Sequence, residues 1–145
     1  MFLSSERLLS CLMRGSRIIL RRQVGGVSGY ESEFGYSRAV RVGNMVFIAA
    51  TSGLYRFEPD LVLDTYLQTK RAIQRINEAL KALEFGLDDI VRLRVFAKQG
   101  LCLDDFKKAY REFFADSKPA LTLVYVTGFP SDKTILEIEA EAVKE

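Results

Sequence analysis

The sequence contains no histidine and only two cysteines among its 145 residues. The absence of histidine excludes Ser-His-Asp and Cys-His catalysis, imidazole general bases and zinc sites with histidine ligands. Acid–base chemistry must therefore come from carboxylates, tyrosine, lysine, a backbone group or water. We predict neither a metal site nor a bound cofactor.

The two cysteines, Cys11 and Cys102, form no CxxC pair and no ligand cluster. We expect two reduced structural thiols, as is usual in a cytoplasmic protein. A long apolar run is also missing: the uninterrupted runs span a handful of residues, whereas a membrane-spanning helix needs roughly 20. We therefore predict a cytoplasmic protein without a membrane segment.

A large excess of one charge is absent as well, because the sequence contains 21 basic and 19 acidic residues. This balance argues against nucleic acid as the main partner, since a basic excess usually provides that affinity. With 48% hydrophobic and 28% charged residues, the composition is typical of a folded globular protein. The length fits one domain.

The first 25 residues are an exception, with five arginines against one glutamate. This segment has the charge of a targeting peptide or a nucleic-acid arm, but it lacks a proper apolar region followed by a small-residue cleavage site. We favour a short helix with Ser5 as its N-cap and Gly15 as its stop. The predicted organisation is an N-terminal extension over residues 1–16 and a single domain over 17–145, with Met13 as an alternative start.

Hydrophobic periodicity beyond the extension predicts several strands and two helices. Each helix begins after an aspartate that can cap it, Asp64 or Asp104, and Gly86 is expected to end the first one. The glycine-rich segment VGGVSGYESEFG is expected to form a loop, and it lacks the GK[ST] ending of a phosphate-binding loop. The predicted strands are 17–23, 38–42, 45–50, 90–98, 120–127 and 135–143.

Strands mixed with two helices favour an α+β fold in which the helices cover one face of a sheet. On the last strand, Glu137, Glu139 and Glu141 alternate with apolar residues and share the other face. Arg92 and Arg94, on another strand, are suitable partners for these carboxylates. The pattern indicates either an ion-paired surface or a glutamate that points into a cleft and moves protons.

Four segments, taken in order, resemble the reactive intermediate deaminase family, also called the YjgF or L-PSP endoribonuclease family. They are GYSRAVRVGNMVFIAA (35–50), QTKRAIQRINEALKALEFGLDDIVRLRVF (68–96), DDFKKAYREFF (104–114) and PALTLVYVTGFP…LEIEAEA (119–142). The resemblance implies a chorismate-mutase-like fold, in which a mixed sheet carries two helices on one face. It also implies a homotrimer with ligand clefts between subunits.

Active members of that family hydrolyse enamines and imines such as 2-aminoacrylate, releasing ammonia and a 2-keto acid. Tyr36 matches the family's cleft tyrosine, and Glu137 matches the glutamate that positions the attacking water. The resemblance therefore implies that Tyr36 and Glu137 are the catalytic residues.

The sequence departs from the family pattern in the substrate-binding part of the cleft. Leu121 stands where the family's Pro-Ala-Arg motif has an arginine that binds the substrate carboxylate, and Ala49 begins an Ala-Ala pair in place of Ser-Gly. Leu121 and Leu123 share one strand face, which makes this side of the cleft apolar. Losing the arginine costs roughly 3–5 kcal/mol of carboxylate binding. Arg38 is a candidate for a compensating cation.

Three functional hypotheses follow from these departures. The first is a homotrimer that binds a small, less acidic or more apolar metabolite between subunits, with the 2-aminoacrylate-type activity lost or weak. The second is a weak enamine or imine deaminase that uses another cation. The third is an RNA-acting or translation-inhibiting protein, which only the basic N-terminal segment supports.

Overall fold

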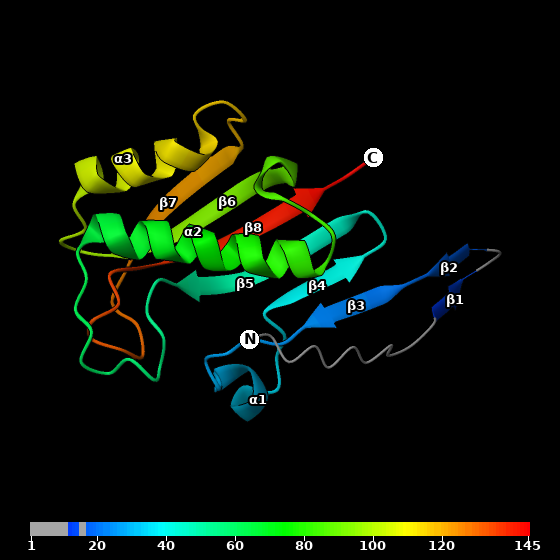
Figure 1. Cartoon of the computed structure of the whole chain (residues 1–145), viewed down its shortest axis with the longest axis horizontal. Helices are drawn as coiled ribbons and strands as arrows, with labels where there is room; N and C mark the ends of the chain where they lie inside the picture. Colours follow the sequence, from blue (N-terminus) through cyan, green and yellow to red (C-terminus); the bar gives the residue numbers. More distant parts are fainter. Residues whose placement is uncertain (1–11, 15–16) are drawn as a thin grey trace.

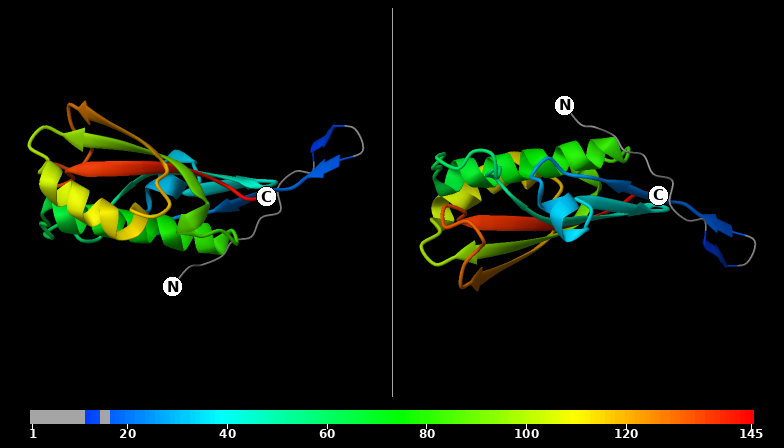
Figure 2. Two further views of the ribbon diagram at one scale, coloured as in Figure 1. Left: turned by 90° about the horizontal axis from the view of Figure 1, so that it is seen from above. Right: turned by 90° about the horizontal axis from the view of Figure 1, so that it is seen from below.

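A computed structural model describes residues 12–14 and 17–145. In this part of the chain a six-stranded sheet, with strand order β3-β4-β5-β8-β6-β7, carries α2 and α3 on one face (Figure 1; Figure 2). Neighbouring strands are antiparallel except β6 and β7, which are parallel, so the sheet is mixed. The predicted α+β class, with two helices on one face of a mixed sheet, is confirmed.

The strands and helices of this domain have the following bounds. The strands are β3 (Arg21–Val24), β4 (Ala39–Val42), β5 (Met45–Ser52), β6 (Ile90–Lys98), β7 (Ala120–Val126) and β8 (Leu136–Val143). The helices are α1 (Tyr30–Phe34), α2 (Thr65–Ala82), the 3₁₀ turn η1 (Leu87–Asp89) and α3 (Leu103–Phe114).

The N-terminal region differs from the sequence-based expectation. Leu12–Arg14 forms β1, which pairs antiparallel with β2, Arg17–Ile19. The predicted helix therefore does not extend over Leu12–Arg14, and the predicted strand 17–23 is divided between β2 and β3. The rest of the predicted helix, including Ser5 and Gly15, lies outside the described residues, as does Cys11.

The first long helix begins as predicted but ends differently. The Asp64 side chain accepts a hydrogen bond from the Leu67 amide at 2.9 Å, which confirms it as the N-cap of α2. The left-handed residue after α2 is Glu84, with φ 65°, whereas Gly86 is extended with φ −137°. The turn comes early because the Phe85 amide donates to the Leu80 carbonyl at 2.9 Å and the Phe85 ring is buried in the core.

The start of α3 also differs from the prediction. The N-cap position is occupied by Cys102, an exposed free thiol, and Asp104 lies in the first helical turn, where it pairs with Lys107 at 3.0 Å. The Cys102 amide donates to the Thr65 hydroxyl at 3.2 Å, so a contact with α2 determines where α3 begins.

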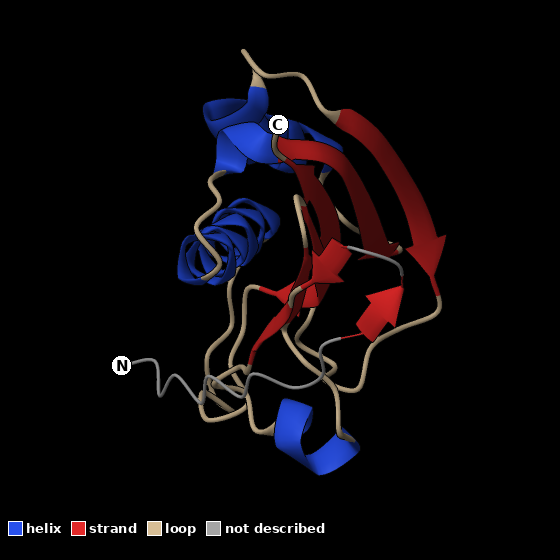
Figure 3. Cartoon of the chain, turned by 90° about the vertical axis from the view of Figure 1, so that its right-hand side faces the viewer, coloured by secondary structure: helices blue, strands red, loops and turns tan. Residues whose placement is uncertain are grey.

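The core lies between the helices and the sheet, on the left of the sheet in Figure 3. On the helix-free face, Arg94 pairs with Glu139 at 2.7 Å and with Glu141 at 3.3 Å, and Arg92 pairs with Glu141 at 3.6 Å. The sequence-based pairing of these arginines with two of the glutamates is confirmed. Phe47, directly opposite Glu141 in the β5–β8 register, is 43% exposed on this face.

Two kinds of feature are absent from the described residues, a membrane-spanning helix and a metal-binding cluster. No helix there has the length and apolar character needed to cross a bilayer. No group of three or more Cys, Asp or Glu side chains in this part of the chain is arranged to hold a metal ion.

Candidate functional site

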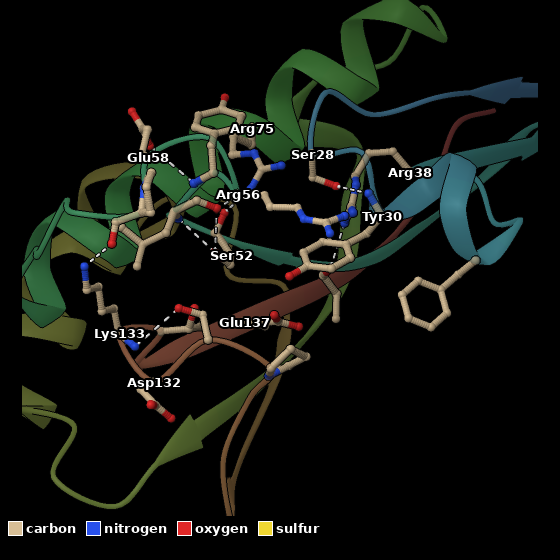
Figure 4. A pocket seen from close by; sticks show the side chains of 18 of the residues that line it. Ser28, Tyr30, Arg38, Ser52, Arg56, Glu58, Arg75, Asp132, Lys133 and Glu137 are labelled. Atoms are coloured by element: carbon tan, nitrogen blue, oxygen red, sulfur yellow. Dashed lines mark hydrogen bonds between the residues drawn. The ribbon is translucent and has the colours of Figure 1, made fainter.

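A cavity of about 600 Å³ opens beside α1, at the ends of β5 and β8 (Figure 4). The connection between β5 and α2 forms one wall, and the turn before β8 forms another. Aromatic rings, arginines and two glutamates are among the side chains that line the cavity. The lining includes Ser28, Tyr30, Phe34, Tyr36, Arg38, Ala50, Ser52, Leu54, Tyr55, Arg56, Glu58, Arg75, Pro130, Lys133 and Glu137.

Glu137 comes from β8, where it pairs with Ser52 of β5 on one side and Phe96 of β6 on the other. Its two neighbours on the same strand face are ion-paired, but no cation lies within ion-pair distance of Glu137 in the described part of the chain. Burial raises the pKa of the Glu137 carboxyl, and the nearby Arg38 and Arg75 guanidinium groups oppose that shift only in part. This carboxyl is therefore suited to exchange a proton at a higher pH than an ordinary glutamate.

Arg38, which immediately precedes β4, is buried and fully engaged. Its Nε and Nη2 donate to Glu31 Oε1 at 3.0 and 2.7 Å, and Nη2 also donates to the Tyr36 hydroxyl at 3.2 Å. Its Nη1 donates to the Ala50 carbonyl at 2.7 Å and to the Thr51 hydroxyl at 3.0 Å. Five N–H donors therefore already have partners within the chain.

Glu31 reaches Arg38 because of the glycines around α1. A Cβ on Gly26 would overlap the Glu31 side chain, and Gly29 and Gly35 both have positive φ, at 84° and 78°. Burial raises the pKa of Glu31, but hydrogen bonds from Ser28 and Arg38 outweigh it and the pKa is lowered overall. The glycine-rich segment, expected to be a loop, therefore contains a short helix, and this helix places the buried Glu31 carboxylate beside Arg38.

Arg75 of α2 is a second arginine in the cavity wall, and it is only 9% exposed. Its Nη1 donates to the Ser52 carbonyl at 2.6 Å and to the Leu54 carbonyl at 3.2 Å. Its guanidinium carbon lies 4.1 Å from the centroid of the Tyr55 ring, a cation–π contact. Burial, the largest influence, lowers the pKa of Arg75.

Arg75 was missed by the sequence-based reasoning, although the helical periodicity contains a signal. It follows Ala72 by three residues and precedes Ala79 by four, and both alanines belong to the buried stripe of α2. An arginine within such a stripe cannot point straight into solvent. On a helical projection Arg75 therefore lies on the buried side of α2, whereas the adjacent Gln74 lies on the exposed side.

Gln68 of α2 fixes the two loops that border the cavity. Its Nε2 donates to the Leu63 and Lys133 carbonyls at 2.9 and 2.8 Å, and its Oε1 accepts from the Ile135 amide at 2.8 Å. Gly53 lies so close to this helix that a Cβ there would come within 2.3 Å of the Gln68 carbonyl oxygen. The cavity walls are thus anchored to the core helix.

Tyr36, Arg38 and Glu137, three of the residues predicted from the sequence, line this one cavity. Ala49 lies in the β5 bulge, next to Ala50, which does line it.

Leu121 and Leu123 are not among the residues that line this cavity. They are on β7, opposite Leu93 and Val95, and thus on the helix side of the sheet. Leu121 is 42% exposed, and Leu123 packs against the core.

The chain is similar to known proteins over most of its length. A model of the endoribonuclease L-PSP family matches residues 29–144. A RutC family protein from Pyrococcus abyssi is 38% identical over 76% of this chain and 87% of its own length. The Escherichia coli 2-iminobutanoate/2-iminopropanoate deaminase is 31% identical over 75% of this chain and 87% of its own length.

A crystal structure shares the fold over nearly its whole length. It is that of a YjgF/YER057c/UK114 family protein from Mycobacterium tuberculosis, which superposes with a TM-score of 0.77 at 32% identity. The match covers 86% of this chain and 99% of that one.

Proposed function

The chain belongs to the endoribonuclease L-PSP family, and from that premise we propose that its cavity binds a small imine or enamine and hydrolyses it to ammonia and a 2-keto acid. The observation that carries the proposal is the Glu137 carboxyl, which lines the cavity without an ion-pair partner in the described residues and has a raised pKa. The deaminase name of the E. coli relative supports the same reaction class.

Glu137 supplies the proton transfers of this reaction. An enamine first becomes the protonated imine by taking up a proton from solvent at its terminal carbon. In its ionised form Glu137 then accepts a proton from water while the water oxygen bonds to the carbon of the protonated imine. The product is a neutral carbinolamine. Glu137 then returns the proton to nitrogen, the C–N bond breaks, ammonia leaves, and the hydroxyl proton passes to water as the 2-keto group forms. The Tyr36 hydroxyl, which accepts a hydrogen bond from Arg38, orients the ligand beside this carboxyl.

The deaminase proposal is preferred to binding without turnover because of the charges around Glu137. The sequence-based argument for lost activity depended on a missing cation at position 121. Arg75 lines the cavity that contains Glu137 and makes no ion pair within the described residues. An anionic imine in this cavity therefore has a positive charge nearby.

Release of 2-keto acid from 2-aminoacrylate generated in situ, measured with and without the protein, tests the proposal. We expect acceleration over buffer, and we expect Glu137→Gln to lower the rate about 10²-fold or more. Glu139→Gln is the matched control, since Glu139 lies on the same face of β8 but pairs with Arg94. No acceleration, or equal activity of the two variants, contradicts the proposal.

We extend the proposal to the assembly, which we infer to be a homotrimer that buries the helix-free face of the sheet. Exposed apolar side chains on that face, Phe47 at 43% and Val124 at 42%, support burial against other copies. Leu121, exposed on the edge strand β7, then remains a candidate for contact with a ligand bound to a neighbouring copy, whereas Leu123 packs against the core of its own chain. Light scattering should give about three times the 16.4 kDa chain mass, and a monomer at micromolar concentration contradicts the inference.

A further inference from the structure

An anionic ligand beside Glu137 requires a cation whose N–H groups are not already in use. The cationic side chains that line the cavity are Arg38, Arg56, Arg75 and Lys133. Arg38 is saturated by Glu31, Tyr36 and the β5 bulge. Arg56 is exposed and ion-paired with Glu33 at 2.5 Å.

Lys133 is half-buried and its Nζ donates to the Pro59 carbonyl, but an ammonium lacks the two-pronged geometry that binds a carboxylate. Arg75 differs from Arg38 and Arg56 in having no carboxylate partner within the described residues, and from Lys133 in being a buried guanidinium. Within residues 20–145 its hydrogen bonds all come from Nη1 and end on carbonyl oxygens, and no carboxylate lies within ion-pair distance. In the same part of the chain no side-chain nitrogen or oxygen is both fully buried and without a partner. Its Nε and Nη2 donors are therefore not fully buried, and the side chain that carries them lines the cavity.

From this arrangement we propose that Arg75 binds the carboxylate of the ligand and that the ligands are 2-imino or enamine acids with an aromatic or large apolar side chain. The inference rests on the proposed function, because it concerns the same cavity. In the first part, Arg75 of α2, in the same chain as Glu137, takes the role of the arginine that the family has at the position of Leu121. The second part follows from the size and lining of the cavity.

The position of the guanidinium supports the first part. Ser52, whose carbonyl accepts from Arg75 at 2.6 Å, is the β5 residue directly opposite Glu137. The Tyr55 ring, whose centroid lies 4.1 Å from the guanidinium carbon, holds the group by a cation–π contact. Anchored in this way, Arg75 loses little side-chain entropy when it binds a carboxylate, and it can offer Nε and Nη2 together as a fork.

The burial of Arg75 supplies the driving force. A buried guanidinium without a counter-ion is unfavourable, and carbonyl oxygens with an aromatic face compensate only in part. A ligand carboxylate would provide the missing negative charge. Glu137 does not provide it, because the two groups make no ion pair and the Glu137 pKa remains raised.

The cavity is large for a three-carbon acid. At about 600 Å³, it falls in the range of about 300–1,000 Å³ that accommodates drug-sized ligands. Its lining also includes Phe34, Tyr36, Leu54, Tyr55 and Pro130. An aromatic or branched side chain buries apolar surface against these residues, whereas a methyl group leaves most of the space to water.

Binding of stable 2-keto acids, measured by isothermal titration calorimetry, tests the inference without requiring turnover. We expect phenylpyruvate to bind at least about 10-fold more tightly than pyruvate. We expect Arg75→Met to weaken phenylpyruvate binding about 10²-fold and to change the affinity for its methyl ester less than about 3-fold. Arg75→Lys keeps the charge without the fork and should restore part of the affinity.

Arg111→Met is the control, because it removes one positive charge from the far helix α3. It should leave the affinity for both ligands unchanged. Absence of phenylpyruvate binding to the wild-type protein, unchanged affinity in Arg75→Met and Arg75→Lys, or equal loss of acid and ester binding overturns the assignment of Arg75. Equal affinity for pyruvate and phenylpyruvate overturns the ligand class.

The two proposals fail in distinguishable ways. If acids bind through Arg75 but no imine is hydrolysed, the proposed function is wrong and the binding inference stands. If imines are hydrolysed and Arg75→Met retains the wild-type KM, the binding inference is wrong and the function stands.

Discussion

Arg38 donates from Nε and from Nη2 to the same carboxylate oxygen of Glu31, at 3.0 and 2.7 Å, and both side chains are almost fully buried. The pair connects α1 to the start of β4 and so holds one wall of the cavity. Since it uses donors that a ligand would otherwise need, Arg38 acts as a structural arginine, and the task of binding an anion passes to Arg75.

Replacing Glu31 with Gln should destabilise the protein by about 3–5 kcal/mol at neutral pH, because Arg38 is left as a buried charge without its partner. Chemical denaturation measures this loss. Glu33→Gln, in the same helix, removes an exposed ion pair and should cost less than about 1 kcal/mol. Similar losses in the two variants would contradict the structural role of the buried pair.

The destabilisation by Glu31→Gln should also depend on pH. The pKa of Glu31 is lower in the folded protein than its ordinary value. Its ionised form therefore stabilises the fold above the unfolded-state pKa, and this contribution is lost as the pH falls through the folded-state pKa. The difference between wild type and variant should shrink in strongly acidic buffer. A constant difference across the acidic range would refute this sign.

Glu137 should show the opposite pH dependence. Because its pKa is raised in the folded protein, its stabilising contribution is complete below the unfolded-state pKa and is lost as the pH rises through the folded value. Glu137→Gln should therefore raise the melting temperature at pH 7.5 and have little effect at pH 4. A variant less stable than wild type at pH 7.5 would show that Glu137 has a stabilising partner.

Gly53→Ala should destabilise the protein by about 1–3 kcal/mol, since the new Cβ would lie 2.3 Å from the Gln68 carbonyl oxygen. The surrounding loop borders the cavity, so ligand affinity should fall as well. Gly128→Ala is the matched control in the opposite loop, where a Cβ meets nothing within 4 Å. Equal stability of the two variants by thermal melting would show that the loop simply moves away from α2.

Leu121→Arg tests the proposed assembly. If β7 of one copy faces the cavity of another, the new guanidinium should tighten pyruvate binding about 10-fold or more. Leu121→Gln controls for the loss of the apolar side chain. An unchanged affinity in a protein confirmed to be trimeric would place position 121 away from the ligand.

Local sequence patterns were sufficient for most of the fold. Alternation placed β6 at Ile90–Lys98, and the Asp64 cap with its apolar periodicity identified α2. The errors occur where distant contacts compete with local preference. Burial of Phe85 moved the left-handed turn from Gly86 to Glu84, and a bond to Thr65 moved the start of α3 away from Asp104.

The order of residue types along the chain was enough to identify the α+β class, because that class depends on periodicity. The resemblance of its motifs to a known family indicated Glu137 and Tyr36, and both side chains line the cavity. The roles of the arginines depended on folding. Arg38 meets a carboxylate from a glycine-flanked helix, while Arg75 packs on a tyrosine from a loop and has two donors that are not fully buried. Which cation is already neutralised is decided by contacts between segments far apart in sequence, and periodicity carries no information about those.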